Sequence, residues 1–407
     1  MIQYDRPSGR RWYAVGLGTA TTFTVFAMAT SCMPVLFSEI AEELDLSIVQ
    51  IGTVWGFGSM AAIFSILLAG LAADRFGVKR TVTVGCFLAA VFGASRGFAD
   101  SFASLTVTSL LFGFASEAVP VVIVKNTSLW FHGRGLAAAQ GITTAGVGGG
   151  MMLGAMLSAT VLSPLLGGWQ NVMFFYGGLS LLLGLLWLLT AAEPEHEDSP
   201  IKIAAPSPGR SLSHLFHIRG VWLIAIAMLG FAGCNKGVVG YLPLYLRSNG
   251  WTATAADGAL AALNAAGTVA AIPLTLLSDK LGKRKAVLVP GVIITVIGVG
   301  ALSVITGPVA WLPAILIGGV RDMIWAMAAT MIVETDGVGL AYSGTAVGIV
   351  HMFTRIGYTI SPPIGNSLET LHPGLAFVFW AGLAVVSLLG FAFVKETGRV
   401  HSPNVPD

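Results

Sequence analysis

Charged residues are scarce in this chain of 407 residues, because Asp, Glu, Lys and Arg together make up only 10% of it. A soluble globular domain carries about 25% charged residues, so the shortage argues against a soluble fold. Cysteine is rarer still, and Cys32, Cys86 and Cys234 all fall within apolar stretches. We interpret them as packing residues, so the sequence indicates neither a disulfide framework nor a metal site. No nucleotide-binding loop or serine–histidine pair is recognisable, and we expect no cofactor, no nucleic-acid partner and no enzymatic activity.

Apolar residues, by contrast, make up 55% of the chain and occur in long blocks. A block of about 20 apolar residues can cross a bilayer as a helix, since a helix satisfies its own backbone hydrogen bonds. The 51 glycines agree with this, because small residues let membrane helices pack closely. We therefore predict an all-α, multi-pass membrane protein embedded in a lipid bilayer. The twelve predicted spans are 13–37, 48–73, 81–99, 103–129, 138–162, 169–192, 219–246, 254–278, 286–306, 309–333, 340–365 and 373–395.

The basic residues outside these spans predict the orientation. With the N-terminus in the cytoplasm, sixteen Lys and Arg residues fall on the cytoplasmic side and only Arg96 and Arg247 fall on the outer side. Cytoplasmic loops of membrane proteins are enriched in Lys and Arg, so both termini are predicted to be cytoplasmic. Arg6, Arg10 and Arg11 lead directly into the first span and no cleavable signal peptide is evident. We therefore expect the first helix to be retained in the inner (plasma) membrane.

A polar stretch with four prolines separates the first six spans from the last six. At about 26 residues it is too short to form a globular domain, so we interpret it as a cytoplasmic linker. The predicted organisation is an N-terminal six-helix bundle at 1–192, a linker at 193–218 and a C-terminal six-helix bundle at 219–407. We expect the protein to be a monomer.

A similar short motif follows the second and the eighth predicted spans. In each copy an aspartate at a helix end is followed by a glycine turn and then by basic residues. The copies comprise Gly70, Asp74, Arg75, Gly77, Lys79 and Arg80, and then Asp279, Lys280, Gly282, Lys283, Arg284 and Lys285. Such an aspartate can accept hydrogen bonds from the first amides of the next helix, where the helix dipole favours an anion. A turn that serves only membrane topology is the alternative to a gating role.

The first copy resembles the signature of the major facilitator superfamily between its second and third spans, and twelve spans in two halves resemble that family as well. Ala72 and Val78 depart from the signature, and Thr275 replaces the first glycine in the second copy. The resemblance implies two six-helix bundles that give alternating access to a site near the bilayer midplane. The gating residues that it implies are Asp74, Arg75, Asp279 and Lys280.

A glycine-rich run from Gly141 to Gly154 occupies the fifth predicted span. It lacks the Gly-Pro pair of the drug–proton antiporter motif in this family. It also lacks the preceding strand and the Lys-Ser/Thr pair of a phosphate-binding loop. We therefore predict that these glycines allow close helix packing, with a hinge as a second role.

Ionisable residues interrupt several predicted spans, although a charge at mid-bilayer costs roughly 2.5 to 3.5 kcal/mol on insertion scales. They are Glu117 in the fourth span, Lys236 in the seventh, Arg321 and Asp322 in the tenth, and His351 and Arg355 in the eleventh. The family resemblance implies that spans 1, 4, 7 and 10 line a central cavity. Three cations against two carboxylates leave an excess of positive charge, which an anionic solute would compensate.

Lys236 and one of Arg321 or Arg355 are predicted to bind the anionic group, because an ammonium and a planar guanidinium suit a carboxylate, sulfonate or phosphate. The further candidate substrate contacts are Asn235, Tyr241 and Thr24. The candidate proton-coupling residues are Glu117, Asp322 and His351, in that order of preference.

Each assignment has a structural alternative. The cations could form internal ion pairs with Asp322 or Glu117, Arg355 could gate instead of binding, and His351 could serve packing. Since neighbouring helical residues point about 100° apart, we expect Arg321 or Asp322 to pair sideways with another span.

These residues predict a secondary transporter of a small organic anion. The chain resembles an organic-anion or monocarboxylate member of the superfamily. We expect it to be a symporter that uses the proton as its coupling ion. The alternative is proton-driven efflux of drug-like or amphiphilic metabolites, which Glu117 fits and the three bases do not.

Overall fold

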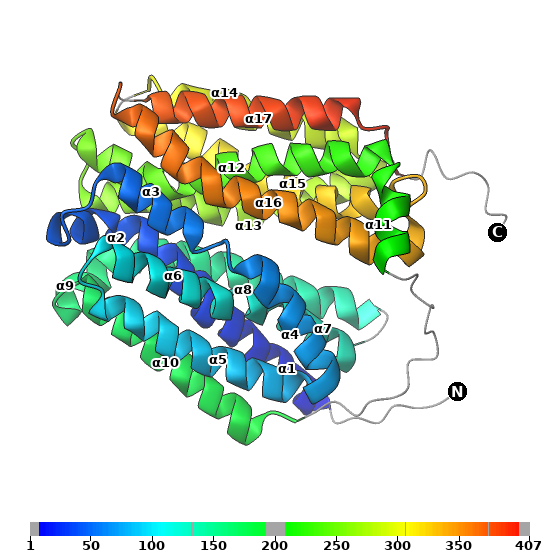
Figure 1. Cartoon of the computed structure of the whole chain (residues 1–407), viewed down its shortest axis with the longest axis horizontal. Helices are drawn as coiled ribbons and strands as arrows, with labels where there is room; N and C mark the ends of the chain where they lie inside the picture. Colours follow the sequence, from blue (N-terminus) through cyan, green and yellow to red (C-terminus); the bar gives the residue numbers. More distant parts are fainter. Residues whose placement is uncertain (1–7, 132–133, 193–207, 306, 373, 399–407) are drawn as a thin grey trace. The chain divides into compact units, whose positions relative to one another are not determined.

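The computed structural model describes residues 8–131, 134–192, 208–305, 307–372 and 374–398. Within these ranges the chain is helical and contains no strand (Figure 1). The chain divides into two compact units. The first unit is Met1–Glu197 with Thr252–Ala261, and the second unit is Asp198–Trp251 with Ala262–Asp407.

The first unit contains the helices of the six N-terminal spans. Most of these spans consist of consecutive helical segments, because proline, glycine and π-helical turns interrupt the hydrogen-bond ladder. The segments are α1 (Ser8–Thr21), the π-helical η1 (Thr22–Met28) and α2 (Ala29–Glu43); α3 (Ile48–Phe57) and α4 (Ala62–Phe76); α5 (Val78–Ser95) and the 3-10 turn η2 (Arg96–Phe98); α6 (Phe102–Ser116) and α7 (Ala118–Trp130); α8 (Arg134–Leu157), the π-helical η3 (Ser158–Leu162) and α9 (Ser163–Leu166); and α10 (Trp169–Thr190).

The second unit is built from longer uninterrupted helices. Its segments are α11 (Pro208–Phe216), α12 (Arg219–Ser248), α13 (Ala253–Leu281), α14 (Lys285–Leu302), the 3-10 turn η4 (Pro308–Ala310), α15 (Trp311–Glu334), α16 (Gly339–Glu369) and α17 (Leu375–Phe393). Of these helices, only α13 extends into the first unit, and it does so with its first turns.

Eleven helical stretches of the described residues are long and apolar enough to cross a membrane, from Gly9–Glu43 to Leu375–Phe393. Their limits lie within a few residues of eleven of the predicted spans. The agreement follows from the hydrophobic thickness of the bilayer, which sets the length of each apolar block before any packing is considered.

The remaining predicted span corresponds to α16, which is not among the eleven. α16 has 31 residues and is therefore about 46 Å long at ~1.5 Å per residue. Met352, Ile356, Ile360 and Ile364 form a ridge along it at four-residue spacing, with 38–46% of each residue exposed. One side of α16 is thus apolar and exposed, while polar residues such as Arg355 are buried against the unit. The count of twelve spans and the cytoplasmic termini remain predictions.

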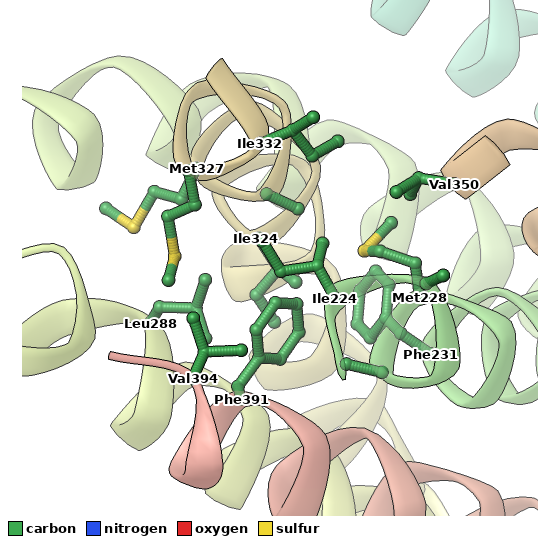
Figure 2. Close-up of a cluster of buried hydrophobic side chains, with 14 of the residues drawn as sticks. Ile224, Met228, Phe231, Leu288, Ile324, Met327, Ile332, Val350, Phe391 and Val394 are labelled. Carbon is green, nitrogen blue, oxygen red and sulfur yellow. The ribbon is translucent and has the colours of Figure 1, made fainter. Parts of the chain in front are cut away.

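A hydrophobic core holds the helices of the second unit together (Figure 2). The labelled side chains are Ile224, Met228 and Phe231 of α12, Leu288 of α14, Ile324, Met327 and Ile332 of α15, Val350 of α16, Phe391 of α17 and Val394 beyond it. Unbranched methionine fills irregular gaps between the branched side chains. α12 packs along both α16 and α17, so this core fixes the position of α12 relative to α16.

Three glycines of α8 confirm the predicted close helix packing. Gly146, Gly150 and Gly154 are spaced by four residues and pack against the first span. A methyl group added at Gly150 would lie 2.8 Å from Cβ of Ala27, and one at Gly154 would lie 2.8 Å from the carbonyl oxygen of Met28. The π-helical η1 therefore lies where the first and fifth spans come closest.

Arg96 was counted among the cations of the outer side, but the structure buries it, leaving only 1% exposed. Its guanidinium carbon lies 3.7 Å from the centre of the Phe112 ring, and Nη1 donates to the carbonyl oxygen of Ala29 at 3.3 Å. Gly93 provides space beside the guanidinium. Because Ala29 directly follows η1, Arg96 stabilises the irregular part of the first span.

Residues 193–207 of the predicted linker lie outside the described residues. The rest of the linker includes α11, which is docked on the second unit. Leu215 of α11 is fully buried, and the His214 ring stacks on Tyr342 of α16 with the ring centres 4.3 Å apart. Nε2 of His214 also lies 2.9 Å from the carbonyl oxygen of Gly337. The end of the linker is therefore a structural part of the second unit, while the predicted boundaries at 192 and 219 remain predictions.

Candidate substrate-binding site

Two of the predicted cations converge on one aromatic ring in the second unit. Lys236 of α12 and Arg355 of α16 are each only 8% exposed. The Nζ atom of Lys236 lies 5.6 Å from the centre of the Tyr358 ring, and the guanidinium carbon of Arg355 lies 5.5 Å from it. A tyrosine ring attracts cations through its electron-rich face. Tyr358 therefore holds two positive charges in one part of the unit.

The third cation, Arg321, is engaged by its own sequence neighbour. Its Nε donates to Oδ1 of Asp322 at 2.7 Å, and its Nη1 donates to Oδ1 of Asn264 on α13 at 2.8 Å. Gly267 of α13 leaves room for this carboxylate, since an added Cβ would lie 2.6 Å from Oδ2 of Asp322. The Arg321 side chain is long enough to reach the carboxylate of its neighbour Asp322, although adjacent helical residues point in different directions. Asn264 provides the predicted contact with another span.

The structure thus distinguishes the three predicted ligands. Arg321 is 6% exposed and its charge is compensated by Asp322 at ion-pair distance. Lys236 and Arg355 share an aromatic ring. Arg321 is therefore engaged with Asp322, whereas Tyr358 brings Lys236 and Arg355 together.

The other predicted contacts of the second unit differ in their surroundings. Asn235 is partly buried, and His351 is exposed on α16. Tyr241 is 2% exposed and packs against Tyr245, Phe377 and Trp380, which makes it part of an aromatic core.

Tyr358 is at this site but is not among the substrate contacts predicted from the sequence. Trp325 of α15 lies beside it, with the ring centres 6.2 Å apart. The available signal was the spacing of Tyr358 three residues after Arg355, which places the two on one face of a helix. Its contact with Lys236 needs α12 beside α16 and could not be read from spacing.

The predicted proton carrier, Glu117, lies in the first unit at the junction between α6 and α7. Pro120 has no N–H, so the carbonyl of Ser116 loses its helical donor and α6 ends there. Glu117 is partly buried. Thr24 is also partly buried, within η1, whereas the hydroxyls of Thr21 and Thr22 donate to carbonyls of their own helix.

In both units the motif aspartate is followed by a glycine with a positive φ. Gly77 has a φ of +86° and Gly282 a φ of +63°, a region that side chains other than glycine rarely adopt. In the first unit, Asp74 forms an ion pair with Lys125 of α7, and the Lys125 Nζ lies 2.5 Å from the Asp74 Oδ1.

In the second unit, Arg284 connects the motif aspartate to another helix. It pairs with Asp279 and with Glu334 at the end of α15, where Nη2 lies 2.9 Å from Oε1. Glu334 and Asp279 raise the pKa of Arg284 above its usual range, and the hydrogen bond to Glu334 is the largest cause. Arg75 lies beside the Phe76 ring, and Lys280 is exposed. In each unit, the motif aspartate is therefore tied to the end of that unit's fourth span.

Metal ligands do not gather anywhere in the described ranges, where no group of three or more His, Cys, Asp or Glu side chains could hold an ion. The chemistry of the site is that of charge, hydrogen bonding and aromatic contact, which suits recognition of a solute.

Relatives with known names are transporters. The chain is 29% identical over 196 residues to the probable galactarate/D-glucarate transporter GudP of Escherichia coli (strain K12), covering 46% of this chain and 42% of that protein. It is 24% identical over 380 residues to the 3-(3-hydroxy-phenyl)propionate transporter of the same strain, covering 89% of each. It is 25% identical over 400 residues to the bacillibactin exporter of Bacillus subtilis (strain 168), covering 92% and 94%. The chain spans less than half the length of GudP and of the hexuronate transporter of Bacillus subtilis (strain 168), which it also matches.

Solved structures share the fold. The bacterial homologue of the human lysosomal transporter Spinster, inward-facing and unoccupied, has a TM-score of 0.73 at 16% identity and covers 96% of this chain and 95% of its own. The nucleoside transporter NupG has a TM-score of 0.77 at 15% identity, with 94% and 99% covered. At these identities the likeness concerns the fold alone.

The family model of the Major Facilitator Superfamily matches residues 19–343, which is most of the chain. The family and these relatives are transporters, which confirms the prediction that the chain is not an enzyme. Its multi-pass helical architecture, its repeated turn and this match lead to one conclusion: the chain belongs to the major facilitator superfamily.

Proposed function

We propose that this chain is a secondary active transporter that moves a small carboxylate-type organic anion by alternating access, in symport with protons. The observation that carries the proposal is the pair of buried cations, Lys236 and Arg355, that both contact the Tyr358 ring. Burying a cation is costly, so a membrane protein keeps it where it pairs with an opposite charge or binds a solute. A carboxylate between the two cations would accept hydrogen bonds from both.

The named relatives support the choice of solute. The printed names include transporters of galactarate and D-glucarate, of hexuronate and of 3-(3-hydroxy-phenyl)propionate, all of which are organic acids. Arg321 then serves to position Asp322 and α13, and Asp322 is the second candidate for proton transfer after Glu117.

The membrane arrangement is part of the proposal. α16 is the eleventh of twelve spans, because its apolar ridge faces outward and its polar side packs within the second unit. Both termini lie on the cytoplasmic side of a bacterial-type inner membrane. The motif turns and their basic residues then also face the cytoplasm, where loops of membrane proteins are enriched in Lys and Arg. The protein acts as a monomer.

Uptake into proteoliposomes tests the transport activity. The purified protein should take up radiolabelled glucuronate or 3-hydroxyphenylpropionate with saturation, and an inward proton gradient should raise the accumulated amount. Protein-free liposomes provide the control. Flat traces across a broad panel of small carboxylates, with or without the gradient, would remove the proposed function.

Glu117→Gln tests the coupling to protons. The amide keeps the size of the side chain but cannot carry a proton, so we expect gradient-driven accumulation to fall to the level reached without a gradient. Exchange of labelled for unlabelled substrate should persist, because it needs no net proton movement. Asp322→Asn is the matched variant, and intact accumulation in Glu117→Gln together with loss in Asp322→Asn would assign the proton to Asp322.

Export is the second candidate function. The bacillibactin exporter matches 92% of this chain, more than the organic-acid transporters do. Inside-out vesicles distinguish the two functions. A proton-driven exporter would accumulate labelled substrate in vesicles with an acidic lumen, whereas a proton symporter would not.

A further inference from the structure

Three aromatic rings lie beside the two cations of the second unit. The ring centre of Trp325 on α15 is 6.2 Å from that of Tyr358 on α16 and 5.8 Å from that of Phe231 on α12. Trp325 and Tyr358 are partly buried, whereas Phe231 is only 1% exposed and belongs to the hydrophobic core (Figure 2). Together the rings form an aromatic cluster. It extends from Tyr358, which contacts Lys236 and Arg355, into the core of the unit.

Trp325 lies deep within its membrane span. It is about 14 Å from the end of α15 at Glu334 and about 21 Å from the start of the helix at Trp311, at ~1.5 Å per residue. Tryptophans that anchor a helix at the membrane surface lie near the ends of spans, at the level of the headgroups. An anchoring role therefore does not account for Trp325.

The face of α15 that carries Trp325 also carries a cation. Trp325 follows Arg321 by four residues, so the two side chains lie on one face of the helix. Leu312 and Leu316 of the same helix are 58% and 47% exposed, as expected of residues that meet lipid. They lie about 140° and about 180° around the helix from Trp325. Trp325 is thus directed toward the charged side of the span, away from these exposed leucines.

The indole of Trp325 has a hydrogen-bond donor that the protein does not use. Its Nε1 makes no hydrogen bond with the described residues and remains accessible to a molecule of solvent size. A donor in the middle of a span is costly unless water or a ligand satisfies it. Trp325 therefore offers a flat apolar surface and a donor to a solute held beside the cations.

These surroundings suit an aromatic acid better than a sugar acid. Each hydroxyl of a sugar acid loses hydrogen bonds to water on entering the site and needs a polar partner in return. The side chain that contacts both cations is a ring, and further rings continue from it. A planar aromatic body gains from contact with such rings and has few polar groups to satisfy.

We propose that the transported anion is an aromatic carboxylate, whose carboxylate group binds Lys236 and Arg355 and whose ring packs on Trp325. A hydroxyl on that ring would accept a hydrogen bond from the indole Nε1. The inference rests on the proposed function, because it concerns the same site. It adds the substrate class and a residue that determines specificity.

Binding to the purified full-length protein tests the substrate class without any variant. Isothermal titration calorimetry compares 3-phenylpropionate, D-glucuronate and propionate, which share one carboxylate group and differ in what carries it. We expect 3-phenylpropionate to bind at least about tenfold more tightly than the other two, because only its ring packs on Trp325. Equal or tighter binding of D-glucuronate or propionate would overturn the inference and leave the proposed function intact. Absence of binding by all three acids would instead remove the proposed function, on which the inference rests.

Trp325→Leu tests the ring contact. Leucine keeps an apolar side chain, so the affinity for 3-phenylpropionate should fall about tenfold while propionate binds as it does to the wild type. Trp311→Leu is the matched control at the start of the same helix and should bind both acids like the wild type. Trp325→Phe should retain most of the affinity, and the thermal unfolding midpoint shows that each variant is folded. An unchanged affinity for 3-phenylpropionate in Trp325→Leu, or an equal loss for both acids, would overturn the assignment of Trp325.

Discussion

Replacing Lys236 with methionine is expected to weaken binding of the transported anion at least about 100-fold, because it removes one of two buried cations that share Tyr358. Methionine has a similar length and keeps the packing of α12, so the charge is the main change. Equilibrium binding of the labelled substrate to purified protein gives the affinity, and counterflow in proteoliposomes gives the transport rate. The thermal unfolding midpoint shows that the variant is folded.

Lys283→Met is the control for this change, since Lys283 is exposed and lies outside the spans. It should bind the anion like the wild type. A wild-type affinity in Lys236→Met would assign Lys236 a structural role, and the anion site would then have to be sought elsewhere. Lys236→Arg should restore part of the affinity, because it returns the charge with a different geometry.

Gly150→Leu is expected to lower the free energy of unfolding by about 3 kcal/mol or more. Even one added carbon at Gly150 would overlap the carbonyl oxygen of Phe23 and crowd Ala27, and both belong to the π-helical part of the first span. The backbones of η1 and α8 would have to separate, and the contacts of Gly146 and Gly154 with the first span would then be lost as well. The unfolding midpoint and the yield of monodisperse protein measure the effect.

Gly141→Leu is the matched variant on the same helix. A Cβ at Gly141 would meet no atom within 4 Å, so leucine should be tolerated and should favour the helix by about 1 kcal/mol relative to glycine. Equal stability of the two variants would contradict the packing argument, because only one of them should force two helices apart.

The spans themselves could be predicted because hydropathy acts locally. Each apolar block has to match the bilayer thickness, and this sets helix limits such as Arg219–Ser248 without knowledge of any neighbour. α16 shows the limit of that signal, since a helix with one polar side has a weaker apolar pattern. The π-helical turn of η1 was not predicted, and its close contacts with α8 involve residues far away in the sequence.

The candidate site was predicted in its parts. The cost of burying charge singled out Lys236, Arg321 and Arg355 as unusual residues within apolar spans. The pattern did not show that Asp322 engages Arg321, since neighbouring side chains on a helix diverge and only the long guanidinium closes the distance. Arg96 was also hidden, because an arginine near a span end resembles an ordinary loop cation.

By itself, the sequence determined that this chain is a multi-pass helical membrane protein with repeated turns, since bilayer thickness and glycine backbone freedom act on residues close together along the chain. Only the tertiary structure decided which cations share Tyr358, which is compensated by Asp322 and where the fifth span meets η1. Those outcomes depend on helices far apart in the sequence that pack side by side, and hydropathy carries no information about which helices become neighbours.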